Sequence, residues 1–148
     1  MLYRFAVKEL SAGAIQRRFG HTVVVMQYYP RFVGRDLIDE YCRNLAPAKD
    51  LFTEFKALER SLKDHDRAFE QIHYEERFSL SPEGVSDLQR LSALSAARDV
   101  YLICQCLALQ RCHADLLLLA ARHLFQAGVQ WPRQTYDVFS NRLKAGQF

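Results

Sequence analysis

Three cysteines and a histidine lie close together in the chain, and this cluster is the segment most suited to chemistry. The residues are Cys104, Cys106, Cys112 and His113. The Cys112-His113 pair precedes a long apolar stretch that is predicted to be a helix, and the partial positive charge at a helix N-terminus lowers the pKa of a nearby thiol. Cys104 or Cys112 is therefore a candidate catalytic nucleophile, with His113 as its base or orienting group.

Two other interpretations of this cluster remain open. Zinc favours cysteine and histidine ligands, but Cys-x-Cys followed by an adjacent Cys-His pair lacks the usual gaps of about two to four residues, so we expect no metal and no cofactor. Free cysteine is also among the most often buried residue types, so all the thiols could be inert core groups. A phosphatase loop is excluded, because Gln110 stands where an arginine would have to follow Cys104.

A second polar segment follows the apolar run Thr22–Gln27. Arg31 and Arg35 flank Gly34 there, at the start of a predicted helix. Helix N-termini bind anions, and the planar guanidinium group matches a carboxylate or phosphate, so both arginines are candidate ligands for a small anion. Tyr29 could stack against a ring in the same ligand. The alternative is a solvated pair of charges beside a turn.

The elements that must position these residues follow from the hydrophobic pattern. Leu2–Val7, Thr22–Gln27 and Asp99–Cys104 are predicted strands, and the last two are apolar without alternation, as in strands covered on both faces. Helical spacing of apolar residues predicts helices over Arg35–Leu45, Lys49–Leu62, Arg67–Glu76, Ser81 to about Ala97, His113–Ala127 and Tyr136–Leu143. Ser81 and Pro82 are typical of a helix start, and Gly128 is the predicted C-cap of the His113 helix.

Strands separated by helical crossovers predict the α/β class: a small parallel or mostly parallel sheet covered by helices, in one domain over residues 1–148, with the tail 129–148 packed on it. Ligands of such sheets bind beyond the carboxyl ends of the strands. If Thr22–Gln27 and Asp99–Cys104 are parallel, we expect Arg31 to face one shared pocket with the Cys104–His113 loop. Antiparallel strands would place the two groups at opposite edges.

Composition excludes several classes of protein. The chain has 148 residues, of which 49% are hydrophobic and 25% charged, as in an ordinary globular domain. A net charge of +3 and a pI of about 8.7 are only mildly basic. The longest apolar run, Leu116 to Ala121, is too short to span a membrane, and Arg4 interrupts the apolar start, so we expect a cytoplasmic protein with reduced thiols.

Two functional hypotheses follow. The first is a site for a small anionic ligand at the strand ends, with thiol- and imidazole-dependent catalysis. The alternative is a non-catalytic binding or interaction module in which the cysteines are structural. Nucleic acid is one partner considered for this second class, because of Arg17-Arg18 and the mild positive charge.

Several short motifs occur in a characteristic order. They are Tyr29-Pro30-Arg31, Leu45-Ala46-Pro47, Phe55-Lys56, Leu102-Ile103-Cys104 and Cys112-His113. This set resembles the bacterial YeaO-like proteins, a family of unknown function, over roughly Thr22 to Leu124. The resemblance implies a small cytoplasmic α/β domain in which Arg31, Cys104, Cys112 and His113 are retained. The chain departs from the family pattern at Tyr29, Phe32, Cys106 and Ala114, which replace a tryptophan, a glycine, an acid and an arginine.

Overall fold

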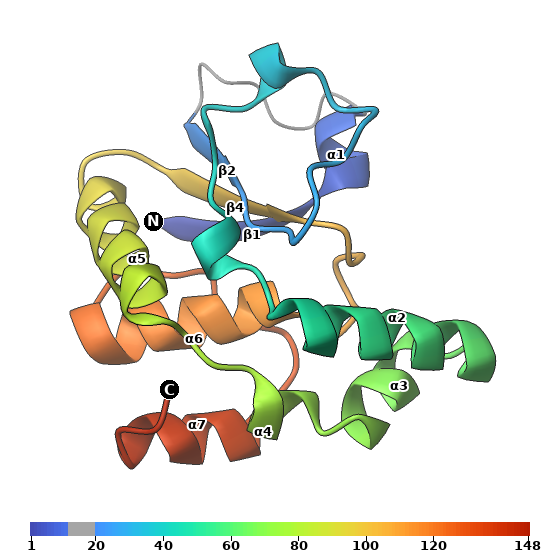
Figure 1. Cartoon of the computed structure of the whole chain (residues 1–148). Coiled ribbons are helices and arrows are strands. Elements are labelled where there is room, and N and C mark those ends of the chain that lie inside the picture. Colours follow the sequence, from blue (N-terminus) through green and yellow to red (C-terminus); the bar gives the residue numbers. More distant parts are fainter. Residues whose placement is uncertain (12–19) are drawn as a thin grey trace.

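Short runs of β-branched and aromatic residues form the sheet of the computed structural model, which describes residues 1–11 and 20–148. Its strands are β1 (Leu2–Ala6), β2 (His21–Val24), β3 (Glu40–Tyr41) and β4 (Val100–Cys104). They lie side by side in the order β1-β4-β2-β3, and all pairs are parallel (Figure 1). The predicted α/β class with a parallel sheet is therefore confirmed, and β2 and β4 end at the same edge.

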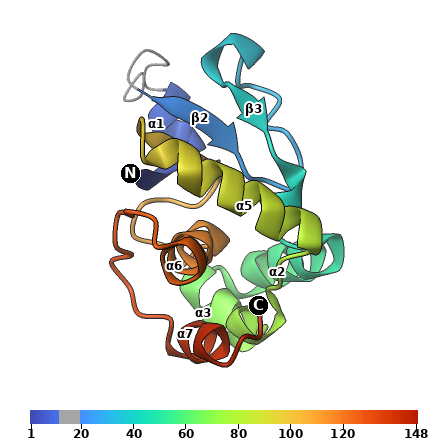
Figure 2. The same ribbon diagram turned by 90° about the vertical axis from the view of Figure 1, so that its left-hand side faces the viewer.

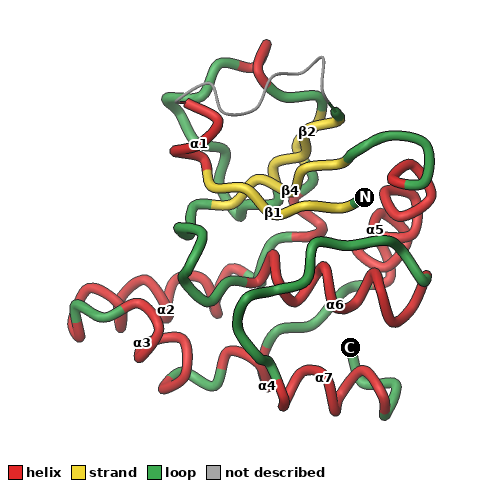
Figure 3. The backbone as a smooth tube through the Cα atoms, turned by 180° about the vertical axis from the view of Figure 1, so that it is seen from behind, coloured by secondary structure: helices red, strands yellow, loops and turns green. Residues whose placement is uncertain are grey.

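The two faces of the sheet have separate cores, because alternate residues of a strand point to opposite sides. Val23 and Leu102 pack with the larger cluster, which lies between the sheet and helices α5 (Pro82–Ser95) and α6 (His113–Phe125). Val24 and Ile103 pack with a smaller cluster that includes residues of α1 (Val7–Ser11) (Figures 1 and 2). The helices are α1 (Val7–Ser11), α2 (Lys49–Leu62), α3 (His65–Gln71), α4 (Tyr74–Arg77), α5 (Pro82–Ser95), α6 (His113–Phe125) and α7 (Asp137–Lys144). Figure 3 shows α7 below α6 on the side away from the sheet.

Local signals fix several helix starts. Helix α2 has the bounds that the apolar spacing predicts. At α5, the Ser81 hydroxyl accepts a hydrogen bond from the Gly84 amide at 3.0 Å, and Pro82 occupies the first turn, as expected of a capped start. Within the described parts of the chain, no helix is long and apolar enough to cross a membrane.

The predicted helix Arg35–Leu45 is wrong. The segment forms a 3-10 turn, η2 (Arg35–Leu37), then β3, then a second turn, η3 (Arg43–Leu45). Its backbone instead bonds to β2: the Asp39 amide donates to the Thr22 carbonyl at 3.0 Å, and the Cys42 amide donates to the Val24 carbonyl at 2.8 Å. These long-range bonds replace those of a helix, so no long helix begins at Arg35 to attract an anion.

Two other boundaries differ from the prediction. The stretch Arg67–Glu76 contains two short helices, α3 and α4, separated at His73, which has a left-handed backbone with φ 57°. Helix α6 ends at Phe125, and its C-cap is Gln126 rather than Gly128. The Gly128 carbonyl instead accepts a hydrogen bond from the Leu2 amide at 2.9 Å, so the chain there runs beside β1.

The second predicted strand is shorter than expected. Strand β2 ends at Val24 rather than Gln27, although the Val25 amide still donates to the Ile103 carbonyl at 3.1 Å. Helix α1 ends at Ser11, and the description of the chain resumes at Gly20, so Arg17-Arg18 lies outside the described residues.

Candidate functional site

The carboxyl ends of β1, β4 and β2 meet at one edge of the sheet, and the cysteine cluster lies there. Cys104 is the last residue of β4, and Cys112 precedes α6 after a short loop. The two cysteines are buried against each other, with Cys106 of the loop packed against them and half-buried. All four cysteines of the chain are free thiols. The sequence therefore correctly predicted a group of thiols at this edge.

Cys112 caps the N-terminus of α6. Its sulfur accepts a hydrogen bond from the Ala114 amide at 3.4 Å, in the position that a serine or aspartate oxygen usually takes. Helix α6 has 13 residues, and the unpaired amides of its first turn carry partial positive charge toward the sulfur. This environment favours a thiolate over a thiol.

The ring of His113 connects Cys112 to the end of β2. Its Nε2 atom lies 2.7 Å from the Val25 carbonyl oxygen, which can only accept, so Nε2 carries a proton. In a neutral ring the other nitrogen, Nδ1, is then an acceptor, and it lies 3.7 Å from the Cys112 sulfur. His113 is thus held in the tautomer that can take the proton of the Cys112 thiol.

The surroundings shift the pKa values of the three thiols in different directions. Burial opposes ionisation of Cys112, but hydrogen bonds from Cys104 and Cys106, together with His113, lower the pKa of Cys112 well below its usual value. The contact of Cys106 with Cys104 raises the pKa of Cys106, as do Cys112 and burial. Cys106 acts to lower the pKa of Cys104, yet contact with Cys112 and burial raise it overall. Of these three cysteines, Cys112 is the one whose surroundings lower its pKa.

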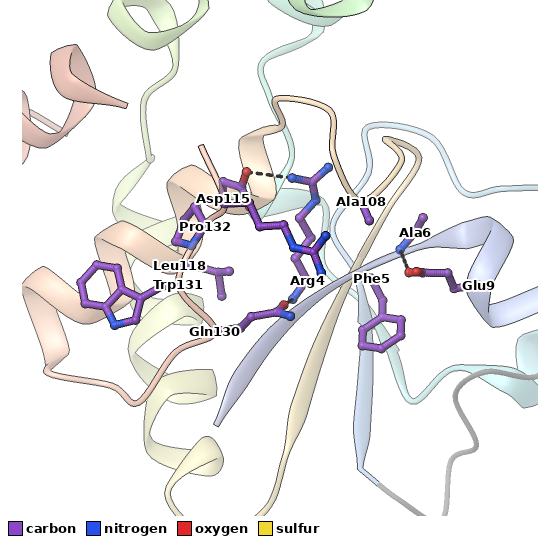
Figure 4. A pocket seen from close by; sticks show the side chains of 11 residues that line it. Arg4, Phe5, Ala6, Glu9, Ala108, Asp115, Leu118, Gln130, Trp131 and Pro132 are labelled. Carbon is purple, nitrogen blue, oxygen red and sulfur yellow. Dashed lines mark hydrogen bonds and ion pairs between the residues drawn. The ribbon is translucent and has the colours of Figure 1, made fainter. Parts of the chain in front are cut away.

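A chain of hydrogen bonds links the Cys112 backbone to three polar residues that the sequence did not single out: Tyr136, Asp115 and Arg4. The Tyr136 hydroxyl accepts a hydrogen bond from the Cys112 amide at 3.2 Å and donates to an Asp115 oxygen at 2.6 Å. The same oxygen lies 2.7 Å from Nη1 of Arg4 in a buried ion pair, drawn in Figure 4. Burial raises the pKa of Asp115, although Arg4 and Tyr136 act in the opposite direction.

Two pockets border these residues. A small one of about 40 Å³ is lined by Cys106 and His113 with Gln27, Lys56 and a group of apolar and aromatic side chains. A larger one of about 240 Å³ lies at the end of β1, where Arg4 and Asp115 face Trp131 and Gln130 (Figure 4). The small pocket is lined by His113 and Cys106, and Cys112 lies buried behind these two residues, in contact with both.

The structure leaves the second group of predicted ligands apart from this pocket. Arg31 is exposed and lines neither pocket. The guanidinium of Arg35 lies 4.0 Å from the centre of the Tyr29 ring, and the Tyr29 hydroxyl donates to the Val33 carbonyl at 3.0 Å. The predicted parallel strands are present, but Arg31 lines neither of the two pockets beside the cysteine cluster. Among the described residues, no three His, Cys, Asp or Glu side chains are arranged to hold a metal ion.

A parallel α/β domain with a cysteine-histidine pair at the start of a buried helix defines the structural class. The sequence model of the family described as the Active DUF488-N3 subclade matches residues 6–128, and the chain belongs to this family. YeaO-like is a name of the same family, so the resemblance in the motifs is confirmed, over a wider span than Thr22 to Leu124. No curated protein and no solved structure matches the chain significantly.

Proposed function

We propose that the protein acts on a small anionic ligand through a thiol-imidazole pair formed by Cys112 and His113. The proposal rests on the contacts of the two ring nitrogens of His113, which fix the orientation of the ring. The Val25 carbonyl accepts a hydrogen bond from one ring nitrogen, and the other nitrogen faces the Cys112 sulfur. This sulfur also accepts a hydrogen bond from the Ala114 amide at the N-terminus of α6. A nucleophile beside a base that is itself oriented by a third group is the usual arrangement for covalent catalysis.

Each group has a defined role in this scheme. Cys112 attacks an electrophilic atom of the ligand as a thiolate, and His113 receives the thiol proton at Nδ1 and returns it to the leaving group. Cys104 and Cys106 stabilise the thiolate as hydrogen-bond donors. Tyr136 fixes the backbone amide of Cys112 and so maintains the start of α6. The description of the matched subclade as active supports retained chemistry at this site.

Lys56 supplies the positive charge for the ligand. It lines the small pocket with His113, and its ammonium group lies 3.3 Å from a Glu59 carboxylate three residues further along α2. A partly exposed pair of this kind is weak, so Lys56 can exchange Glu59 for an anionic ligand at little cost. Arg31 and Arg35 remain proposed anion contacts on the separate loop after β2. The reduced thiols agree with the cytoplasm as the proposed location.

Two reagents of nearly equal size test the site. Iodoacetate carries a negative charge and iodoacetamide does not, and both alkylate thiolates. We expect both reagents to label Cys112 in the native protein. The ratio of iodoacetate labelling to iodoacetamide labelling should be up to about fivefold higher in the wild type than in Lys56→Gln, since an ion pair near a protein surface contributes up to about 1 kcal/mol. Peptide mass spectrometry measures the labelling of each cysteine.

The controls separate charge from access. Lys49→Gln removes an exposed cation from the same helix and should leave the preference unchanged. Cys42 serves as an internal reference, because burial and the nearby Asp87 raise its pKa to about 12 and should keep it unreactive. Labelling of Cys112 only in denaturant would refute the nucleophile. Equal preference in wild type and Lys56→Gln would refute the anion contact.

A further inference from the structure

Cys106 has features that the proposed reaction does not require. It lies in the loop between β4 and α6, is half-buried, and contacts both other thiols of the cluster. It also lines the small pocket together with His113. Hydrogen bonding to the Cys112 thiolate would be served equally well by an alcohol. A second thiol that is in contact with a thiolate is, in addition, able to form a disulfide with it.

The third thiol is less suited to this role. Cys104 is fully buried at the end of β4, between β1 and β2. Its sulfur lies 3.7 Å from the Phe5 carbonyl and 3.8 Å from the Cys106 carbonyl. A residue held in the middle of a sheet cannot shift toward a partner, whereas Cys106 belongs to a loop that can. Cys106 is therefore the better partner for Cys112.

The size of the pocket limits what can reach Cys106 and His113, the two residues next to Cys112 that line it. Its volume is about 40 Å³, and a bound water needs about 10–15 Å³ on this scale, so the space accepts only a few water-sized groups. A bulky disulfide such as oxidised glutathione does not fit beside His113. A hydroperoxide, with two adjacent oxygen atoms, matches the space, and it reacts with thiolates rather than thiols.

We propose that the pocket admits small hydroperoxides, which oxidise Cys112 and Cys106 to a reversible disulfide; this inference rests on the proposed function, because both use the Cys112 thiolate. The thiolate attacks one peroxide oxygen, the O–O bond breaks, and the other oxygen leaves as hydroxide, which takes a proton to become water (or an alcohol, from an organic peroxide). The Cys106 sulfur then displaces the hydroxyl group from Cys112 as water. The two thiols lose two electrons and the peroxide gains them.

Peptide mapping of the full chain tests the inference directly. Arg111 lies between Cys106 and Cys112, so trypsin separates them into peptides 99–111 and 112–122. After treatment of the reduced protein with hydrogen peroxide, we expect these two peptides to be joined, lighter than their sum by the two thiol hydrogens, and released by dithiothreitol. Fragmentation of the joined peptides should place the link on Cys106, because a link on Cys104 gives different fragments.

Variants extend the test. In Cys106→Ser the joined peptides should disappear and Cys112 should carry added oxygen instead, whereas Cys42→Ser should behave as wild type. Absence of joined peptides in the wild type, or a link through Cys104 or Cys42, would overturn the inference. If Cys112 still shows the iodoacetate preference while no link forms, the proposed function stands and only the disulfide fails. If Cys112 reacts with neither reagent in the native protein, both fail.

Discussion

At the scale of single residues, the site depends on groups that come from opposite ends of the chain. Cys112 and His113 are adjacent, so the sequence could reveal them as a pair. Arg4 is 111 residues from Asp115, and Tyr136 is 21 residues beyond it. A period-two strand pattern gave no reason to single out Arg4, and an isolated tyrosine in a tail gave no signal at all. Only the fold brings these supporting residues to the thiol.

Removing the Tyr136 hydroxyl should destabilise the folded protein at the start of α6. Tyr136→Phe leaves the buried Cys112 amide without its partner and removes one of the two hydrogen bonds to an Asp115 oxygen, which keeps the one from Arg4. We expect a loss of about 1–3 kcal/mol in the free energy of unfolding, as for other buried groups left unpaired. Urea denaturation measures it, with Tyr3→Phe as a matched control, since the Tyr3 hydroxyl makes only a 4.0 Å contact with the Met1 sulfur. Equal losses in the two variants would contradict the role assigned to Tyr136.

At the scale of elements, the sequence correctly predicted the helices that depend on apolar spacing and on capping residues. Lys49–Leu62 is a helix because its apolar residues share one face, and Ser81 starts α5 because its side chain caps the helix. The segment Arg35–Leu45 failed for a nonlocal reason. Ile38 packs with the smaller core cluster and Cys42 with the larger, so the segment passes around the edge of the sheet, which no single helix face can do.

The cap of α5 gives a prediction at this scale. Ser81→Ala removes the acceptor for the Gly84 amide and should lower the free energy of unfolding by about 1 kcal/mol. Ser86→Ala, in the exposed middle of the same helix, should be neutral or slightly stabilising, because alanine has the higher helix propensity. Thermal or urea denaturation of the two variants distinguishes capping from a general effect of losing a hydroxyl. A smaller cost at Ser81 than at Ser86 would exclude the cap.

At the scale of the whole molecule, the parallel sheet followed from alternating strands and helices, and it correctly placed the thiols at the carboxyl edge. The position of Arg31 did not follow from strand order. Strand β2 ends at Val24, and the next residues lead to β3 at the sheet edge before the chain enters α2. The path of a loop depends on backbone bonds with distant residues, and a single sequence does not contain that information.

Glu40 of β3 accepts hydrogen bonds from Arg90 of α5, and this contact should make the free energy of unfolding depend on pH. Burial alone would raise the pKa of Glu40, but hydrogen bonds from Arg90 and His21 outweigh it and lower that pKa. A carboxyl with a lowered folded-state pKa contributes stability above its unfolded value of about 4.3, and the contribution is lost as the pH falls through the folded pKa. Glu40→Gln should therefore cost about 1 kcal/mol or less near neutral pH, because Arg90 is half exposed.

Urea denaturation at neutral and strongly acidic pH checks this prediction. The difference between wild type and Glu40→Gln should shrink as the pH falls below the folded pKa of Glu40. Glu70→Gln is the charge-matched control, since Glu70 is exposed and its carboxylate has no partner among the described residues. A difference that stays constant or grows in acid would show that Glu40 stabilises the fold by packing rather than by charge.

Ultraviolet absorbance tests most directly whether Cys112 is a thiolate in the native protein at neutral pH, as proposed. Thiolates absorb ultraviolet light more strongly than thiols, and this absorbance does not depend on access to a reagent. The difference between wild type and Cys112→Ser isolates this sulfur, and serine preserves the start of α6 because it is itself a good helix cap. We predict that the difference persists well below pH 7 and disappears only in acid. A difference that develops only near the ordinary thiol pKa of about 8.5, or above it, would show that Cys112 is a protonated thiol at neutral pH and contradict the proposed nucleophile.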